Sequence, residues 1–296
     1  MTTERILDKA AGKTLKLRDE RLLGYAEWGD PAGMPVLYFH GLHSSRLALY
    51  QPSAFFADHG IRFITVDRPG IGLSTFQRGR TLLDWPDDVA QLADALGLAR
   101  FAILSITGGG MYALACAATM PHRLIGVACV SPSAPLDAPG ISVPGATGTL
   151  MRLARHAPWA LWAVYAALIP RLRRDPRRIS RLFESGLSEP DRQVVARPEI
   201  QQMQVAMLLE AFRSGYWGEV HEMVIAARPW GVRLEKIPIV VQLWTGDQNN
   251  LVPPRHAEYL AHAIPTAQLH ICSGGAYLII DHMREILQSI VGTVAN

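Results

Sequence analysis

The segment Phe101–Gly110, with the sequence FAILSITGGG, constrains the fold of this chain more than any other. An apolar run is followed at once by Thr107 and three glycines, and this pattern predicts a buried strand, a sharp turn and the start of a helix. Thr107 then lies at the apex of the turn. A strand that feeds directly into a helix is the basic unit of a parallel sheet covered by helices.

Other short apolar runs, separated by helical patterns, predict the rest of that sheet. Runs of this kind are typical of strands buried on both faces. The predicted strands cover 13–19, 22–29, 36–40, 62–66, 101–104, 126–130, 237–244 and 267–271, and the predicted core helices cover 81–97, 108–119 and 281–290. The fold class is therefore α/β, with a mostly parallel sheet of eight strands and helices on both of its faces.

One part of the chain interrupts this alternation. From Leu150 to about Ala227 the sequence predicts several helices and no strand, after a stretch rich in Pro, Gly and Ser at 135–144. We interpret residues 137–230 as a helical lid inserted into a core domain formed by residues 1–136 and 231–296.

Composition excludes several functional classes. The chain has 296 residues and a net charge of +3, too small an imbalance to indicate nucleic-acid binding. Its longest apolar stretch, Ala157–Pro170, is too short to span a membrane. The first residues do not resemble a signal peptide, and the three cysteines have no metal-ligand spacing. We expect a cytoplasmic protein with reduced thiols, no metal and no cofactor, which could form a homodimer.

Five short motifs occur in the order typical of one family. They are His40-Gly41, Asp67–Ser74 (DRPGIGLS), the turn at Thr107, Gly246 and Asn249 with Val252-Pro253, and Gly275-Ala276 ahead of Asp281-His282. Together they resemble the α/β-hydrolase fold family over nearly the whole chain. In that family a serine at the turn attacks a carbonyl, a histidine activates the serine, and an acid orients the histidine.

The resemblance places different residues at all three catalytic positions. Thr107 takes the position of the nucleophile and Asn249 that of the acid, while Ala276, or Tyr277 if the alignment shifts by one, takes that of the histidine. Loss of the histidine alone typically removes about as much activity as loss of the whole set. Hydrolysis by the family mechanism is therefore expected to be nearly absent.

The part of the family site that depends on the backbone is predicted to remain. The resemblance implies that the N–H groups of Leu42 and Gly108 face a substrate carbonyl, with His40, Gly41 and His43 shaping the same loop. The lid is rich in aromatic residues that suit a large, partly apolar ligand or that form the core of the lid itself. Those expected to bind substrate are Trp159, Trp162, Tyr216 and Trp217.

Three functions are compatible with these residues. The first is a non-hydrolytic isomerase or epimerase that acts on a small molecule or a modified peptide, similar in its missing triad to the members of this fold that epimerise aspartate in bottromycin-type peptides. In such an enzyme the substrate supplies its own base. The second is a protein that only binds a biosynthetic intermediate. The third is a weak esterase that uses Thr107, with His43 or Tyr277 as its base.

Overall fold

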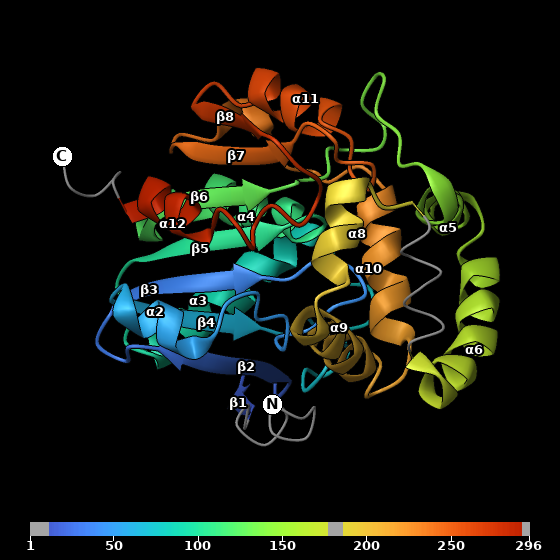
Figure 1. Ribbon diagram of the computed structural model, residues 1–296. Helices are drawn as coiled ribbons and strands as arrows, with labels where there is room; N and C mark the ends of the chain where they lie inside the picture. Colours follow the sequence, from blue (N-terminus) through green and yellow to red (C-terminus); the bar gives the residue numbers. More distant parts are fainter. Residues whose placement is uncertain (1–11, 177–185, 292–296) are drawn as a thin grey trace.

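The computed structural model describes residues 12–176 and 186–291, and contains the predicted eight-stranded sheet (Figure 1). The ends of the predicted core at 1–11 and 292–296, and residues 177–185 of the predicted lid, lie outside these ranges. The strands are β1 (Lys13–Lys16), β2 (Leu22–Gly29), β3 (Met34–Phe39), β4 (Ile61–Val66), β5 (Phe101–Ile106), β6 (Leu124–Val130), β7 (Val241–Gly246) and β8 (Ala267–Cys272). Their order is β1-β2-β4-β3-β5-β6-β7-β8. The pairs β1/β2 and β2/β4 are antiparallel, and all the others are parallel.

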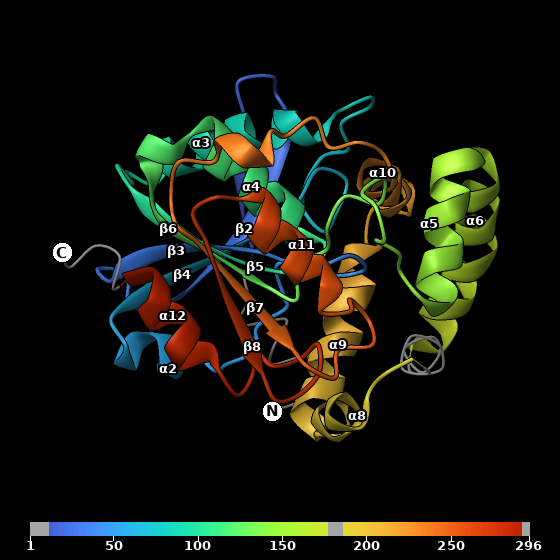
Figure 2. The same ribbon diagram turned by 90° about the horizontal axis from the view of Figure 1, so that it is seen from above.

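Helices cover both faces of the sheet, as the apolar strands predict. One face packs against α3 (Trp85–Ala95), α4 (Gly109–Thr119) and α11 (Arg255–Ala263), and the other against α2 (Ser53–Asp58) and α12 (Met283–Val291) (Figure 2). Each face of the sheet has its own hydrophobic core, and alternate residues of one strand pack into different cores. Leu37 of β3 packs into the core with α3, α4 and α11, and Val36 and Tyr38 pack into the core with α2 and α12. Successive side chains of a strand point to opposite faces, so a strand buried on both sides is apolar throughout.

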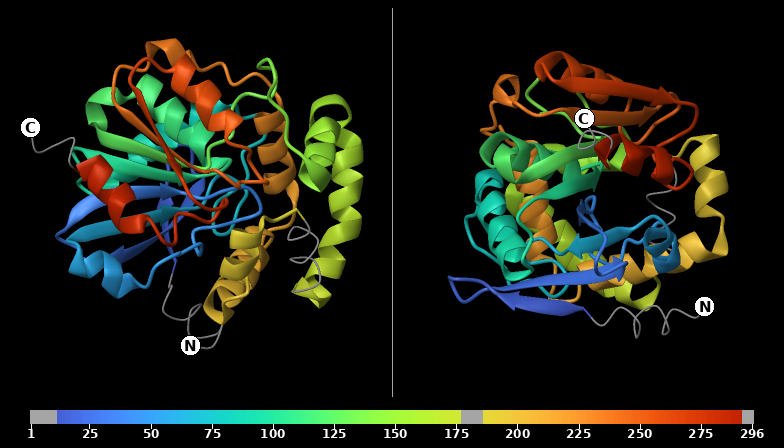
Figure 3. Two further views of the ribbon diagram at one scale, coloured as in Figure 1. Left: turned by 45° about the horizontal axis from the view of Figure 1, so that its top comes forward. Right: turned by 90° about the vertical axis from the view of Figure 1, so that its left-hand side faces the viewer.

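The chain between β6 and β7 folds as helices in its described part. They are α5 (Gly145–His156), α6 (Pro158–Arg174), α8 (Glu189–Val195), α9 (Pro198–Ala211) and α10 (Trp217–Ala227). We call these five helices the helical insertion. They lie beyond the carboxyl ends of the strands, with α10 between the sheet and the outer pair α5 and α6 (Figures 1 and 3). In a parallel sheet ligands bind at this edge, so the insertion covers the place where a site is expected.

Several boundaries differ from the sequence-based prediction. The strand predicted from Ile237 begins only at Val241, after a short 3-10 helix at Leu234–Lys236, because Pro238 cannot donate a hydrogen bond to a neighbouring strand. Two further 3-10 helices, Leu82–Asp84 and Pro121–Arg123, precede α3 and β6. Helices α2 and α11 were not predicted, since each is short. Of the helices that the structure describes, none is both long and apolar enough to cross a membrane.

Candidate active site

The turn between β5 and α4 holds Thr107 in an unusual backbone conformation. Its φ is 46°, in the left-handed region that a β-branched residue rarely adopts. Two residues later, a Cβ on Gly109 would overlap with the carbonyl oxygens of Phe39 and His40. The close approach of α4 to the end of β3 therefore requires glycine, and it fixes the turn that carries Thr107. Backbone strain of this kind is retained where the surrounding structure imposes it, often at functional sites.

A cavity of about 200 Å³ opens around Thr107. Its floor is formed by the ends of strands and by the loops that follow them, including Leu42, Gly108 and Ala276. Its roof comes from the chain around the insertion and is largely apolar. The roof residues are Val143, Met151, Leu187, Met207 and Leu208. Polar lining groups such as Gln204 and Tyr277 are few, as in most small-molecule sites.

Two backbone N–H groups at the floor of the cavity have no acceptor among the described residues. They belong to Leu42 and Gly108, which lie side by side, since a Cβ on Gly108 would be 3.0 Å from Cγ of Leu42. Buried N–H groups are nearly always paired, so two such groups at a cavity indicate a place for an oxygen atom. The Thr107 hydroxyl is close by: a Cβ on Gly41 would overlap with it, and its Oγ1 has no hydrogen-bond partner in the described structure.

The loop that carries the Leu42 N–H is held in place by Arg68. Nη1 of this fully buried side chain donates to the carbonyl oxygen of His40 at 2.6 Å, and Nη2 donates to that of Gly41 at 3.0 Å. In a trans peptide the C=O and N–H point in opposite directions. A hydrogen bond that fixes the Gly41 carbonyl on one side of the loop therefore directs the Leu42 N–H to the other side, where the cavity lies.

Arg68 is in turn positioned by helix α10. Its Nε is 2.5 Å from Oε2 of Glu222, and both side chains are completely buried. Glu222 also pairs with Arg80 through Oε1, which accepts a hydrogen bond from the Tyr112 hydroxyl at 2.8 Å. Burial opposes ionisation of Glu222, but Arg68 and Arg80 outweigh it and lower the pKa of this carboxyl to about 2. A permanently charged carboxylate from the insertion thus fixes the arginine that orients the loop.

A second acid of α10 holds the next residue of the same loop. Oε1 of Glu219 accepts the backbone N–H of His43 at 2.9 Å and lies 3.5 Å from its Nε2, which also contacts the Tyr165 hydroxyl. Burial, with a contribution from nearby Glu222, raises the pKa of Glu219 to about 8, and burial lowers the pKa of His43 to about 4. At neutral pH the carboxyl is therefore protonated and the imidazole is uncharged.

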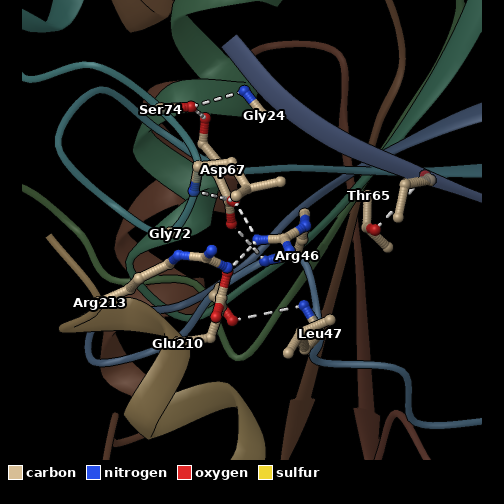
Figure 4. A network of polar contacts seen from close by, with 12 residues as sticks. Gly24, Arg46, Leu47, Thr65, Asp67, Gly72, Ser74, Glu210 and Arg213 are labelled. Atoms are coloured by element: carbon tan, nitrogen blue, oxygen red, sulfur yellow. Dashed lines mark hydrogen bonds and ion pairs between the residues drawn. The ribbon is translucent and has the colours of Figure 1, made fainter. Parts of the chain in front are cut away.

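The far end of the loop is anchored by Arg46, as Figure 4 shows. Its Nη1 lies 2.7 Å from Oδ2 of Asp67, which follows β4, and 2.7 Å from Oε1 of Glu210 on α9. The backbone N–H of Arg46 also donates to Asp67 at 2.7 Å. The loop from His40 to Arg46 is consequently attached both to the sheet and to the helical insertion.

Asn249 and Ala276, the positions predicted for the acid and the histidine, are both buried. Oδ1 of Asn249 accepts the N–H groups of Leu251 and Val252, at 3.1 and 2.9 Å, and its buried Nδ2 has no acceptor among the described residues. Ala276 lines the cavity, and its carbonyl accepts a hydrogen bond from the Ser131 hydroxyl. An aspartate in place of Asn249 could accept the same two bonds, so the amide retains the loop geometry without the charge.

The loop of Ala276 and Tyr277 is fastened to the insertion by Asp191 of α8. The two oxygens of this carboxylate accept the N–H groups of Ala276 and Tyr277, each at 3.0 Å. The Tyr277 hydroxyl accepts a hydrogen bond from Nε2 of Gln204 at 2.9 Å. Ala276 and Tyr277 both line the cavity, so the two alternatives for the family's histidine position remain compatible with the structure.

The structure brings most, but not all, of the predicted site residues together. Those that line the cavity are Gly41, Leu42, His43, Thr107, Gly108, Ala276 and Tyr277. The His40 side chain is completely buried beneath the loop, where its Nδ1 is 2.8 Å from the Gly41 carbonyl oxygen. Asn249 is buried behind the cavity wall. Trp159, Trp162 and Trp217 line a different groove, against which Tyr216 packs, because their helices extend away from the sheet.

Sequence reasoning missed the groups that support the loop. Glu219 and Glu222 are acids three residues apart in the otherwise apolar helix α10, and this spacing places them on one face. That pattern was visible, but its partner Arg68 could not be assigned without the fold. Within residues 12–176 and 186–291, no group of three or more His, Cys, Asp or Glu side chains is arranged to hold a metal ion.

Comparison with known proteins agrees with this architecture. The family model described as "alpha/beta hydrolase fold" matches residues 34–282. The chain is 34% identical to a non-heme chloroperoxidase of Streptomyces lividans, over 42% of this chain and 45% of that enzyme. It is 23% identical to a poly(3-hydroxyalkanoate) depolymerase of Ectopseudomonas oleovorans, over 94% and 90% of the two chains. A hydrolase from Pseudomonas aeruginosa PA01 superposes with a TM-score of 0.72 at 19% identity, over 95% and 98% of the chains. The chain therefore belongs to the α/β-hydrolase fold family.

Proposed function

We propose that this protein is a non-hydrolytic enzyme that binds a carbonyl group at Thr107 and stabilises the enolate formed from it. The observation that carries the proposal is the pair of N–H groups at Leu42 and Gly108, which have no acceptor among the described residues and lie at a cavity that Ala276 and Tyr277 also line. Two such donors stabilise negative charge on an oxygen atom. That charge develops on an enolate as well as on a tetrahedral intermediate.

Thr107 fits the role of a hydrogen-bond donor better than that of a nucleophile. A hydroxyl becomes nucleophilic when a base removes its proton. His43 is the imidazole that lines this cavity in the described structure, but its Nε2 contacts Tyr165 and lies near Glu219. We infer that the Thr107 hydroxyl keeps its proton and adds a third donor to the carbonyl oxygen.

The base in this mechanism is a carboxylate of the substrate, and the reaction class is epimerisation or isomerisation. The carboxylate removes a proton from the carbon next to the bound carbonyl, and the electron pair moves to the oxygen held by Leu42, Gly108 and Thr107. The substrate side chain, now a carboxylic acid whose proton exchanges with solvent, then rotates and returns a proton to the opposite face of that carbon, which gives the epimer and regenerates the carboxylate. An aspartate residue in a modified peptide offers both the carbonyl and the carboxylate.

Hydrogen exchange in heavy water tests the proposal directly. Aspartate-containing peptides with and without a heterocycle next to the aspartate are incubated with the protein in D₂O, and deuterium at the α-carbon is measured by mass spectrometry and NMR. We expect enzyme-dependent incorporation of one deuterium and partial inversion of the aspartate. Binding of the same peptides without any exchange would contradict the enzyme and favour a binding protein.

Leu42 offers a matched pair of variants for this assay. Leu42→Pro removes the N–H donor, whereas Leu42→Ala keeps it and shortens only the side chain. Loss of one oxyanion donor costs about 10²- to 10³-fold in turnover. We expect that loss in Leu42→Pro and a much smaller effect in Leu42→Ala, with circular dichroism to show that both variants fold. Thr107→Val, which removes the hydroxyl and keeps the shape, extends the test to the third donor.

A weak esterase is the second candidate, because His43 and Thr107 line the same cavity. The names of two similar proteins, the poly(3-hydroxyalkanoate) depolymerase and an enol-lactonase from Burkholderia xenovorans LB400, favour this alternative. A panel of 4-nitrophenyl esters separates the two functions. Turnover that disappears in both Thr107→Ala and His43→Ala would establish the esterase and reject the non-hydrolytic proposal.

A further inference from the structure

A second concave surface lies apart from the Thr107 cavity, on the outer side of the helical insertion. This groove encloses about 840 Å³ between α6, α10 and the loop around Phe76–Gly79. It shares no lining residue with the Thr107 cavity. A volume of this size is in the range of ligand sites in proteins. We call it the aromatic groove.

Aromatic side chains in the groove are unusually exposed. Trp159 is 76% exposed, Trp217 52% and Trp162 37%, and Phe76 lines the same surface. The ring centroids of Trp162 and Trp217 are 5.1 Å apart and those of Phe76 and Trp217 are 6.5 Å apart, so these three side chains form one surface. Single exposed apolar side chains are common, but a contiguous apolar patch marks an interaction site. Tryptophan is also among the residues that contribute most to binding at interfaces.

The charged side chains that line the groove in the described structure are all positive. Arg78 and Arg228 are exposed and line it, and in the described structure neither has an acidic partner. By contrast, Arg46, Arg68 and Arg80 in the interior are all paired with carboxylates. The lining includes no Asp or Glu among the described residues. The groove is therefore complementary to a ligand that is apolar along its length and carries carboxylates at its edges.

We propose that the aromatic groove binds an acidic peptide segment whose apolar or aromatic side chains enter between Trp159, Trp162 and Trp217. Arg78 and Arg228 pair with its carboxylates. A concave surface accepts an extended chain with apolar anchors. The inference does not depend on which reaction takes place at Thr107.

Fluorescence anisotropy of a labelled (Glu-Phe)₄ peptide, compared with a labelled (Lys-Phe)₄ peptide, tests this inference. We expect the wild-type protein to bind the acidic peptide about tenfold more tightly than the basic one, and more weakly as salt is added. Arg78→Glu combined with Arg228→Glu should reverse this preference. Trp159→Ser combined with Trp217→Ser should weaken binding of the acidic peptide by about tenfold or more.

Matched variants outside the groove provide the controls. Arg155→Glu combined with Arg174→Glu makes the same charge change at exposed residues elsewhere on the insertion, and Val164→Ser removes an exposed apolar side chain of α6. Both should leave the affinity for the acidic peptide unchanged within about twofold. Equal affinity for the two peptides, or groove variants that bind like the wild type, would overturn the inference. So would groove-dependent binding of anionic vesicles or of poly(dT) without binding of the acidic peptide.

Discussion

At the scale of single residues, the proposed function depends on three positions of the candidate site. The sequence resemblance aligns Thr107, Asn249 and Ala276 with the family's serine, acid and histidine, and in the structure Thr107 and Ala276 line one cavity with Leu42 and Gly108. In our proposal the side chains that break a bond have changed, and the backbone groups that hold a carbonyl have not. Hydrolytic activity should therefore be recoverable by side-chain replacement alone.

The variant Thr107→Ser/Asn249→Asp/Ala276→His tests this expectation. The new aspartate would keep the bonds to Leu251 and Val252, and the new histidine would enter the cavity. We expect hydrolysis of 4-nitrophenyl acetate to rise about ten- to a hundredfold over the wild type, a small part of what an evolved triad supplies. The control is Thr107→Ala/Asn249→Asp/Ala276→His, which has the new acid and histidine but no hydroxyl at position 107. A folded triple variant that does not exceed this control would show that these positions do not correspond to a triad.

Glu219 gives a second prediction at this scale, in the pH dependence of stability. Its pKa rises from the ordinary carboxyl value to about 8 on folding, mainly through burial. The stabilisation that it contributes is complete below its unfolded pKa and is lost as the pH rises towards 8. Between about pH 5 and 8 this group therefore lowers the unfolding free energy by up to about 1.4 kcal/mol for each unit that the pH rises.

Glu219→Gln mimics the protonated carboxyl and should remove the contribution of Glu219 to the pH dependence of the unfolding free energy. Urea unfolding of both proteins between pH 5 and 8 measures the difference. His43, whose pKa falls to about 4, acts in the other direction: its contribution is present above its unfolded pKa and is lost as the pH falls towards 4. A wild type and variant with parallel stability curves from pH 5 to 8 would contradict the protonated state of Glu219.

At the scale of elements, helix α10 connects the insertion to the oxyanion loop. Glu219 holds the His43 N–H, and Glu222 holds Arg68, which binds the carbonyls of His40 and Gly41. The neighbouring Val220 and His221 of the same helix line the aromatic groove. One helix therefore supports the candidate active site with one face and forms the second binding surface with the other.

Removing the charge of Glu222 should disrupt this arrangement. Glu222→Gln leaves Arg68 and Arg80 buried without a carboxylate, which typically costs about 3–5 kcal/mol. We expect a large fall in the unfolding free energy, together with loss of deuterium incorporation at temperatures where the variant is still folded. Asp87→Asn, which breaks an exposed pair with Arg18, should leave the melting temperature nearly unchanged. A Glu222→Gln protein as stable as the wild type would refute this role.

At the scale of the whole molecule, the insertion and the sheet domain are joined by polar contacts around the cavity. Asp191 of α8 accepts the N–H groups of Ala276 and Tyr277, and Glu210 of α9 pairs with Arg46. These contacts place the cavity at the boundary between the two parts. The shape of the cavity therefore depends on the contacts between the helical insertion and the sheet domain.

Asp191→Ala is expected to loosen that boundary. The N–H groups of Ala276 and Tyr277 would lose their acceptor, at a cost of about 1–3 kcal/mol for each that stays buried and unpaired. Hydrogen–deuterium exchange should be faster at Ala276 and Tyr277, and protection in the core strand β5 should change less. Arg192→Ala, next to it on the exposed side of α8, is the control. Unchanged protection of the 276–277 loop in Asp191→Ala would show that α8 does not hold it.

The sequence by itself determined the sheet, the covering helices α3, α4 and α12 and the turn at Thr107, because apolar periodicity and glycine positions are local signals. It also predicted, by resemblance, that Thr107, Asn249 and Ala276 take the three catalytic positions. Only the tertiary structure decided that Arg68, Glu219 and Glu222 orient the loop, and that Trp159, Trp162 and Trp217 line a separate groove. Those contacts join residues far apart in the chain, such as Arg68 and Glu222, and their pairing depends on how the helices of the insertion pack over the sheet, which a local pattern does not encode.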